Sequence, residues 1–208
     1  MYPNVEKVKE KEFKATFEIK TKALYGKLPV AFCMMQEILT ESQLTDEKRL
    51  KEILSMAKSR LQMRFQSSGH TTAALRAMSY ASPLSKLKDL TSGIGYYEIV
   101  KQIEEHFEEE KDVLIKNLQT LTKLLFRPEN MMVSYTAARE GMEDLEKLVS
   151  ELKAKLFTEP VQGQPCVIHC EKKNEGFKTS SKVQYVARAG NFIDGGASYT
   201  GALQIFKV

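Results

Sequence analysis

The chain has 208 residues, of which 42% are hydrophobic and 28% are charged. This length suits one domain or two small ones, and it is sufficient to bury a sizeable core. The composition excludes a disordered chain, a collagen-like fibre and a disulfide-rich secreted scaffold. The net charge of +4 comes from interleaved basic and acidic residues rather than from a basic face, so we expect no nucleic-acid partner.

The cysteines, Cys33, Cys166 and Cys170, are few and odd in number. Such sparse use is typical of a reducing compartment, and we therefore expect a cytoplasmic protein. The N-terminus lacks the apolar stretch of a signal peptide, and no run of about 18 apolar residues occurs. We accordingly expect no membrane partner.

Two regimes follow one another along the chain. Residues 1–157 are rich in leucine and dominated by helical periodicity, whereas residues 158–208 contain one leucine and six of the eleven glycines. Residues 158–165 join the two regimes and include Pro160, Gly163 and Pro165. Proline and glycine end helices and favour linkers, so we predict a domain boundary in this segment.

The first regime begins with a predicted strand, because apolar residues alternate with polar ones from Phe13 to Ile19. Apolar residues at helical spacing then predict helices that begin near Leu28 and near Asp46, the second capped by Thr45. Further helical stripes are expected at residues 73–78, 99–107, 113–126 and 142–156. Residues 131–135 are predicted to form a strand.

The second regime is predicted to be rich in strands. Val183, Tyr185 and Ala187 alternate with polar or small residues, residues 191–196 resemble a turn-rich loop, and residues 198–208 have the character of a strand. The expected fold class is therefore α+β, with a helix-rich layer packed on antiparallel strands.

No zinc motif of two histidines on one helical face occurs, because no two of His70, His106 and His169 lie three to five residues apart. The segment Cys166-Val167-Ile168-His169-Cys170 could supply three zinc ligands. In an extended strand, however, the two cysteines share one face and His169 lies on the other, which favours ordinary strand residues.

Other candidate motifs are weaker. His106 lies within the acidic run 104–110 and could hold a metal weakly with Glu109 or Glu110, although such a run is usually a solvated face. Gly93-Ile94-Gly95 is expected to be a cap or turn, and Gly195-Gly196 with Gly190 does not match a phosphate-binding loop. The residues alone therefore nominate no catalytic, cofactor-binding or metal-binding residue.

Several short segments together resemble a known family. In chain order they are Phe17 to Leu24, Glu37-Ile38-Leu39, Asp46 to Lys51, Ser68-Gly69-His70, Ala74-Leu75-Arg76-Ala77, Lys182 to Val186 and Gly190-Asn191-Phe192. Their order and spacing are similar to those of the presequence-protease and falcilysin branch of the insulinase-like (pitrilysin) zinc metallopeptidases. The resemblance covers most of the chain.

The resemblance implies four related α+β domains in two halves, which enclose a chamber for unstructured peptides. It places residues 1–157 in the later part of the third domain, and residues 158–208 as the linker and first strands of the fourth. The zinc site of the parent enzyme would lie in the first domain, so no zinc is expected on this chain. Gly195-Gly196-Ala197-Ser198-Tyr199 is similar to a family motif that contacts peptide, but it comes too early in the chain, before the predicted strand. We expect His70 only to cap a helix end or to pack in the turn where it lies.

The leading hypothesis is a non-catalytic fragment of a zinc metalloendopeptidase that degrades unstructured peptides. The fragment would form chamber wall, contact peptide substrates and bind the remaining domains of the parent. A second hypothesis is a stand-alone, inactive protein that binds a peptide or a subunit. A third is a small metal-binding protein that uses Cys166, His169 and Cys170. Because the chain starts and stops inside predicted domains, we also expect exposed strands to pair between copies.

Overall fold

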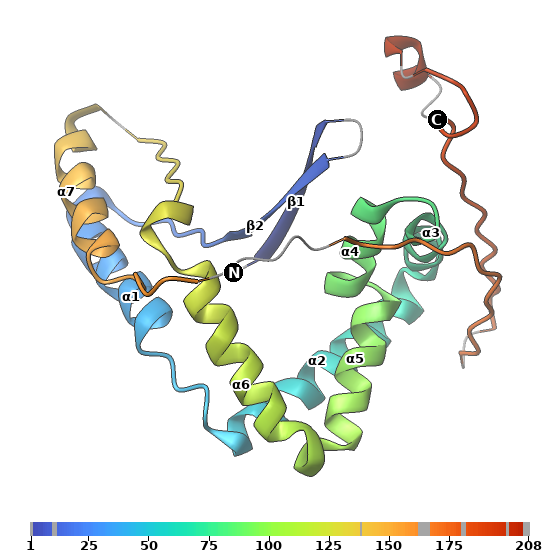
Figure 1. The fold of residues 1–208 in the computed structure, drawn as a ribbon, viewed down its shortest axis with the longest axis horizontal. Coiled ribbons are helices and arrows are strands. Elements are labelled where there is room, and N and C mark those ends of the chain that lie inside the picture. The colour runs from blue at the N-terminus through green and yellow to red at the C-terminus, as the bar shows by residue number, and fades with distance from the viewer. Residues whose placement is uncertain are drawn as a thin grey trace. The chain divides into compact units, whose positions relative to one another are not determined.

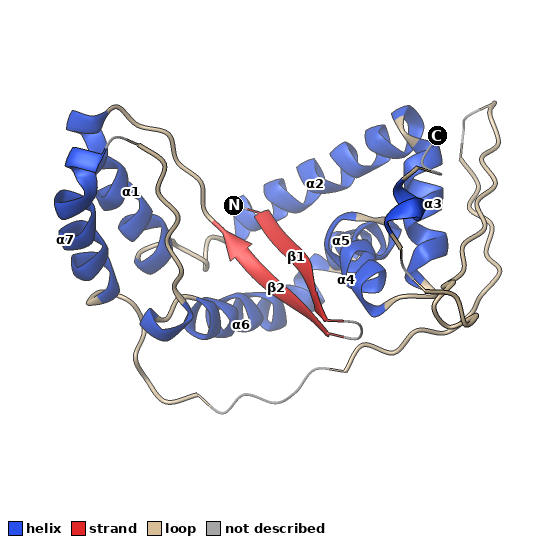
Figure 2. Cartoon of the chain, turned by 90° about the horizontal axis from the view of Figure 1, so that it is seen from above, coloured by secondary structure: helices blue, strands red, loops and turns tan. Residues whose placement is uncertain are grey.

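A computed structural model describes residues 2–9, 12–137, 139–161, 167–179, 182–198 and 200–205 (Figure 1). Most of the described regular structure is helical. The helices are α1 Leu28–Thr40, α2 Glu47–Ser67, α3 Gly69–Ser79, α4 Pro83–Ser92, α5 Ile94–Glu105, α6 Phe107–Leu125 and α7 Met142–Lys153. Short 3-10 turns lie at Tyr25–Lys27, Pro128–Asn130, Arg139–Gly141 and Gly201–Gln204. The strands β1 Tyr2–Lys9 and β2 Glu12–Glu18 pair in a two-stranded sheet (Figure 2).

Local sequence explains several helix ends. Pro29 lies in the first turn of α1, where its missing N–H group has no helical partner to lose. The backbone N–H of Arg49 donates to the Asp46 carboxylate at 2.9 Å, so Asp46 caps α2 in the role predicted for Thr45. His106 separates α5 from α6, so the break falls inside the predicted stripe at residues 99–107, and Phe107 already belongs to α6. The helix α4 has no counterpart among the predicted elements.

The predicted fold class, a helix-rich layer on antiparallel strands, is wrong. Within the described residues, the only sheet is the β1–β2 pair, and the extensive helix contacts are those of α3 with α4 and of α1 with α7. A two-stranded ribbon offers too little apolar surface to support a layer of helices. Among the described helices, α3 therefore packs against α4 and α1 against α7 instead of on a sheet.

Three predicted strands are also absent from the described residues. Residues 131–136 are irregular, residues 182–198 form neither helix nor strand, and Gly201–Gln204 is a 3-10 turn. Tyr199 and residues 206–208 of the last predicted strand lie outside the described residues. Alternation of polar and apolar residues specifies which side chains share a face, but it supplies no neighbouring strand to complete the hydrogen bonds.

The chain divides into two compact units. The first comprises Met1–Asn4, Ala15–Ile53 and Ile103–Pro165, and the second comprises Val5–Lys14, Leu54–Gln102 and Cys166–Val208. The assignment of residues 1–157 and 158–208 to successive peptidase-like domains stays a prediction.

The first unit is held by an apolar cluster between α1 and α7, which run side by side (Figure 1). Its buried members are Phe32, Leu145, Leu152 and Leu156. Partly buried apolar residues pack around them, namely Leu28, Met35, Leu39, Phe126, Met131, Tyr135, Leu148 and Val149. The closing helix thus buries most of the stripe that its spacing predicted, whereas Met142 stays 41% exposed and Leu156 follows the end of α7.

The second unit packs α3 against α4. Two of its buried side chains, Ser79 and Asp89, are polar and fully inaccessible to water. Burial of a carboxylate is costly unless hydrogen bonds and an opposite charge compensate it, which makes this packing the place to look for a site. None of the described helices has the length and apolar character that crossing a membrane requires.

Candidate functional site

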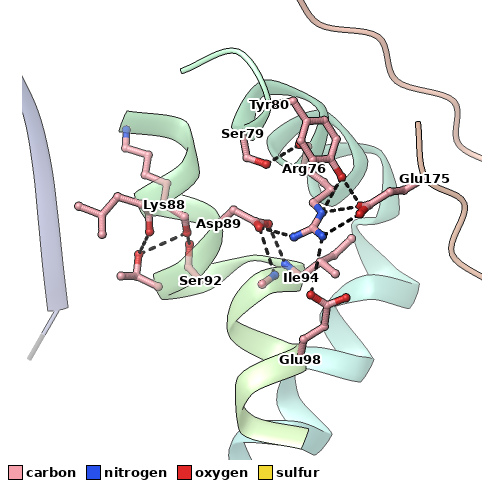
Figure 3. Close-up of polar contacts among 12 residues, drawn as sticks. Arg76, Ser79, Tyr80, Lys88, Asp89, Ser92, Ile94, Glu98 and Glu175 are labelled. Atoms are coloured by element: carbon pink, nitrogen blue, oxygen red, sulfur yellow. Dashed lines mark hydrogen bonds and ion pairs between the residues drawn. The ribbon is translucent and has the colours of Figure 1, made fainter. Parts of the chain in front are cut away.

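Arg76 lies at the centre of a partly buried polar network in the second unit (Figure 3). It belongs to α3 and retains only 9% of its surface, so its guanidinium is largely removed from water. Its Nη1 atom donates to Oδ2 of Asp89 at 2.7 Å, and Asp89 is fully buried in α4. This ion pair joins the two helices that pack most extensively in the unit.

The Asp89 carboxylate also completes the first turn of α5. Its Oδ1 atom accepts the backbone N–H of Ile94 at 3.0 Å, and Oδ2 accepts that of Gly95 at 3.2 Å. The first N–H groups of a helix lack partners within it, and a carboxylate placed there is favoured by the helix dipole. Asp89 therefore fixes three helices at one point, α3 through Arg76, α4 through its own backbone, and α5 through two amides.

The glycines beside Asp89 leave room for its carboxylate. A Cβ atom at Gly95 would lie 2.7 Å from Oδ2 of Asp89, and one at Gly93 would approach the other carboxylate oxygen more closely still. Contacts this short require a shift of the surroundings. Gly93-Ile94-Gly95, predicted as a cap or turn, is the place where the chain passes around Asp89.

The opposite side of the guanidinium holds Glu175, which is far away in the sequence (Figure 3). Arg76 Nε donates to Oε2 of Glu175 at 2.9 Å, and Nη2 donates to Oε1 at 3.3 Å. The Tyr80 hydroxyl donates to the same carboxylate. Glu98 of α5 lies farther away, with Oε2 at 3.7 Å from Nη2. One arginine thus bridges a buried carboxylate and a carboxylate near the surface.

These contacts shift the acidities of the participating groups. Burial by itself lowers the pKa of Arg76. The hydrogen bonds to Glu175 and Asp89 outweigh this effect, so the pKa of Arg76 lies above its ordinary value. Hydrogen bonds from Arg76 and Tyr80 lower the pKa of Glu175. Desolvation, followed by the hydrogen bond to Glu175, raises the pKa of Tyr80. Arg76 and Glu175 are therefore charged at neutral pH, while Tyr80 keeps its proton.

This network, which we call the Arg76 centre, contains Arg76, Tyr80, Asp89, Glu98 and Glu175. Its chemistry is that of an ion-pair network, because the polar atoms described above are engaged with one another. In the sequence, Arg76 stands out only as part of the family-like segment Ala74-Leu75-Arg76-Ala77, and the other four residues were not predicted. The Gly93-Ile94-Gly95 doublet after Asp89 was the one local signal.

The described histidines lie in different surroundings, His106 in the first unit and His70 and His169 in the second. The His70 ring lies beside that of Tyr185 in a tilted arrangement, with 6.0 Å between ring centroids. His106 has its Nδ1 atom 3.7 Å from Glu109 on an exposed face. Within the described part of the chain, no group of three or more histidine, cysteine, aspartate or glutamate side chains could hold a metal ion.

The cysteine-containing candidate is only partly described, because Cys166 lies outside the described residues. His169 is exposed and Cys170 is half-buried, and burial raises the pKa of the Cys170 thiol. The described residues 167–170 form no strand, so the expected alternation of faces does not apply to them. Cys33 is exposed on α1.

The first unit contains a cavity of about 510 Å³ beside α6. It is lined by Ser42, Gln43, Leu44, Thr45, Lys116, Gln119, Thr120, Thr122, Lys123 and Phe157. The lining includes no carboxylate, imidazole or thiol, so no adjacent base of that kind is present to activate its serine and threonine hydroxyls.

Comparison with known proteins connects these observations to a family. Residues 2–103 match the family model of a peptidase-associated region, which is defined for a subfamily of the insulinase-like peptidases. Protein HypA of Clostridium perfringens is 31% identical over 96% of this chain and 20% of its own length. Presequence protease 1 of Arabidopsis thaliana, chloroplastic/mitochondrial, is 24% identical over 91% of this chain and 18% of its own. The mitochondrial presequence protease of Drosophila melanogaster is 30% identical over 58% of this chain and 12% of its own length.

The helical chain with its Arg76 centre is thus a segment of an insulinase-like peptidase. It belongs to the presequence-protease branch of that family, as the ordered motifs predicted. The chain spans about a fifth of the length of the first two relatives. The family implies zinc in the parent peptidase, and the described residues provide no site for it.

Proposed function

We propose that this chain is a non-catalytic segment of a zinc metalloendopeptidase that degrades unstructured peptides. In that enzyme it forms part of the chamber wall, contacts the peptide and docks on the remaining domains. Residues 1–157 would complete the third peptidase-like domain, and residues 158–208 would lead into the fourth. The zinc ion and the general base would come from the other half of the parent.

The observation that carries this proposal is an exposed apolar face on α1. Val30, Met34 and Ile38 follow one another at intervals of four residues, and their exposed fractions are 53%, 58% and 42%. Residues at this spacing lie on one face of a helix. The other face of α1 buries Phe32 against α7, so α1 is apolar on two sides.

A helix that buries one apolar face and exposes another is typical of a segment that a second partner covers. The relatives are about five times longer than this chain, and their remaining domains are the natural candidates for that partner. We call Val30, Met34 and Ile38 the outer face of α1. This face favours a segment that docks on the other domains of the parent. A stand-alone protein would expose fewer aligned apolar side chains on its surface.

The proposal is tested in a chimera. This chain replaces the matching residues of a full-length presequence protease, and cleavage of an unstructured fluorogenic peptide is measured. We expect the chimera to cleave the peptide and the chimera with Met34→Glu to lose most activity, because a carboxylate would be buried in the docking interface. Lys147→Glu, an exposed charge reversal on α7 of the same unit, is the matched control and should keep the activity.

The isolated chain supplies the second half of the test. With zinc added, it should not cleave the peptide, and circular dichroism should show equal helix content for wild type, Met34→Glu and Lys147→Glu. Equal activity of the two variant chimeras would overturn docking through the outer face of α1. Tight peptide binding by the isolated chain, combined with an inactive chimera, would favour the stand-alone binding protein instead.

A further inference from the structure

The residues after the predicted boundary contact α3 at both of its ends. The described residues 167–179 and 182–198, which we call the tail, form neither helix nor strand and belong to the second unit. A segment without regular structure has no backbone ladder to fix its course. Its course must come from individual side-chain contacts, and two of these contacts meet α3.

The first contact lies at the C-terminal end of α3. Glu175 of the tail receives the two hydrogen bonds from Arg76 and one from Tyr80 that were described above. Phe177 adds an aromatic ring, whose centroid lies 5.6 Å from Cζ of Arg76. The contact therefore combines a forked ion pair with a cation–π interaction, which are the two interactions that a guanidinium makes best.

The second contact lies at the N-terminal end of α3. The Tyr185 ring packs so closely on Gly69 that a Cβ atom there would lie 2.5 Å from Cε2 and 2.6 Å from Cδ2 of the ring. The ring of His70 lies beside Tyr185 at a tilt of 51°. Gly69 is needed here because of the space it leaves, since its backbone does not lie in the left-handed region.

The two contacts have compatible spacing. Gly69 and Tyr80 are separated by eleven residues, which is about 16 Å along a helix. Glu175 and Tyr185 are ten residues apart, and an extended chain of that length reaches about 33 Å. The tail can therefore meet both ends of α3 without strain, with its own direction opposite to that of the helix.

We propose that α3 is a recognition surface for this chain's own tail, which it binds through one acidic side chain and two aromatic rings. Arg76 and Tyr80 recognise Glu175 and Phe177, while Gly69 and His70 recognise Tyr185. Ser68-Gly69-His70, the family-like segment without an assigned role, is thereby part of a binding surface rather than of a catalytic site. This inference goes beyond the proposed function and does not depend on the parent enzyme.

Cys170 provides a native reporter of tail release. It precedes Glu175 by five residues, and its thiol is half-buried beside Lys86 of α4. Release of the tail would expose this thiol to an alkylating reagent. Cys33, exposed on α1 in the other unit, reports the intrinsic rate of the reagent in the same sample. Brief treatment with iodoacetamide, followed by peptide mass spectrometry, gives both rates.

Two variants loosen the contacts by different means. Glu175→Gln removes the charge of the first contact, and Gly69→Ala places a methyl group against the Tyr185 ring. Each should accelerate alkylation of Cys170 about fivefold relative to Cys33, as expected from the loss of one charge-assisted or well-packed contact. Alanine is a better helix former than glycine, so Gly69→Ala should leave the helix content of the chain unchanged or higher.

The matched controls are neighbours that make neither contact with α3. Lys178→Gln removes an exposed tail charge eight residues from the thiol, and Val186→Ala shortens the exposed residue after Tyr185. Both should leave the Cys170 rate unchanged. Equal rates in wild type, Glu175→Gln and Gly69→Ala would overturn the proposal, as would equal acceleration by the controls.

Protein concentration distinguishes the chain's own tail from that of a second copy. We expect Cys170 to be equally protected from alkylation in dilute and in concentrated samples. Protection that disappears on dilution, together with a dimer in light scattering, would show that the tail is exchanged between chains and would overturn the intramolecular assignment.

Discussion

The α1–α7 pair of the first unit and the α3–α5 bundle of the second unit are held in different ways. The first depends on buried Phe32, Leu145, Leu152 and Leu156, whose attraction has no preferred direction. The second depends on the Arg76 centre, in which Asp89 must meet one guanidinium and two backbone amides at hydrogen-bonding distances. An apolar side chain can be replaced by another of similar volume at little cost in stability. Removing one partner of a buried ion pair is strongly destabilising, because the other charge is left without compensation.

The largest effect is expected from Asp89→Ala. The variant leaves the guanidinium of Arg76 without its buried partner and removes the acceptor of two α5 amides. Breaking a buried ion pair from one side costs about 3–5 kcal/mol, and we expect the free energy of unfolding to fall by that amount. Urea unfolding followed by circular dichroism measures it. Asp112→Ala on the exposed face of α6 is the control, and a loss as small as that of the control would contradict the role of Asp89.

The apolar cluster should respond to volume rather than to chemistry. Leu152 is 5% exposed, and Leu152→Ala should lower the free energy of unfolding by about 2–5 kcal/mol because a cavity remains. Leu152→Met conserves the volume and should cost less than about 1.5 kcal/mol. The same unfolding experiment compares the two variants. If methionine were as damaging as alanine, the contrast between the two regions would be lost.

A smaller effect is expected from Gly95→Ala. Alanine normally favours a helix over glycine, but here the new methyl group would press on Oδ2 of Asp89. Overpacking of this kind typically costs about 1–3 kcal/mol, so the thermal midpoint should fall instead of rising. Gly26→Ala provides the control, because nothing lies within 4 Å of a Cβ atom at that position. A higher midpoint for Gly95→Ala would show that the Asp89 carboxylate can move aside.

The smallest effect concerns pH. The pKa of Glu175 is lowered by hydrogen bonds from Arg76 and Tyr80, so the charged form stabilises the folded state. This contribution is complete above the usual glutamate value of 4.5 and is lost as the pH falls through the lower folded-state pKa. Wild type should therefore unfold at higher urea than Glu175→Gln at pH 6. The difference should shrink as the pH is lowered below 4.5, and a constant difference would assign the effect to something other than this charge.

Periodicity predicted the apolar region well and the polar region poorly. The predicted stripe at residues 142–156 contains α7, which ends at Lys153, and Leu28 began α1 as expected. The Arg76 centre escaped prediction because its main partners, Asp89 and Glu175, lie 13 and 99 residues from Arg76. The strand predicted at residues 183–187 was wrong for a related reason. Alternating residues describe one strand, and the hydrogen-bonding neighbour has to come from elsewhere in the fold.

The sequence by itself determined most of the helical stripes and membership of the insulinase-like peptidases, because each depends on residues close together or on motifs in order. Only the tertiary structure decided which charges are buried and which surface receives the tail. Asp89 resembles any other acidic residue on a helix until α3 and α5 close around it. Gly69 likewise resembles an ordinary helix start until the ring of Tyr185 is placed against it. Burial and long-range contact are properties of the packed chain, and local sequence does not encode them.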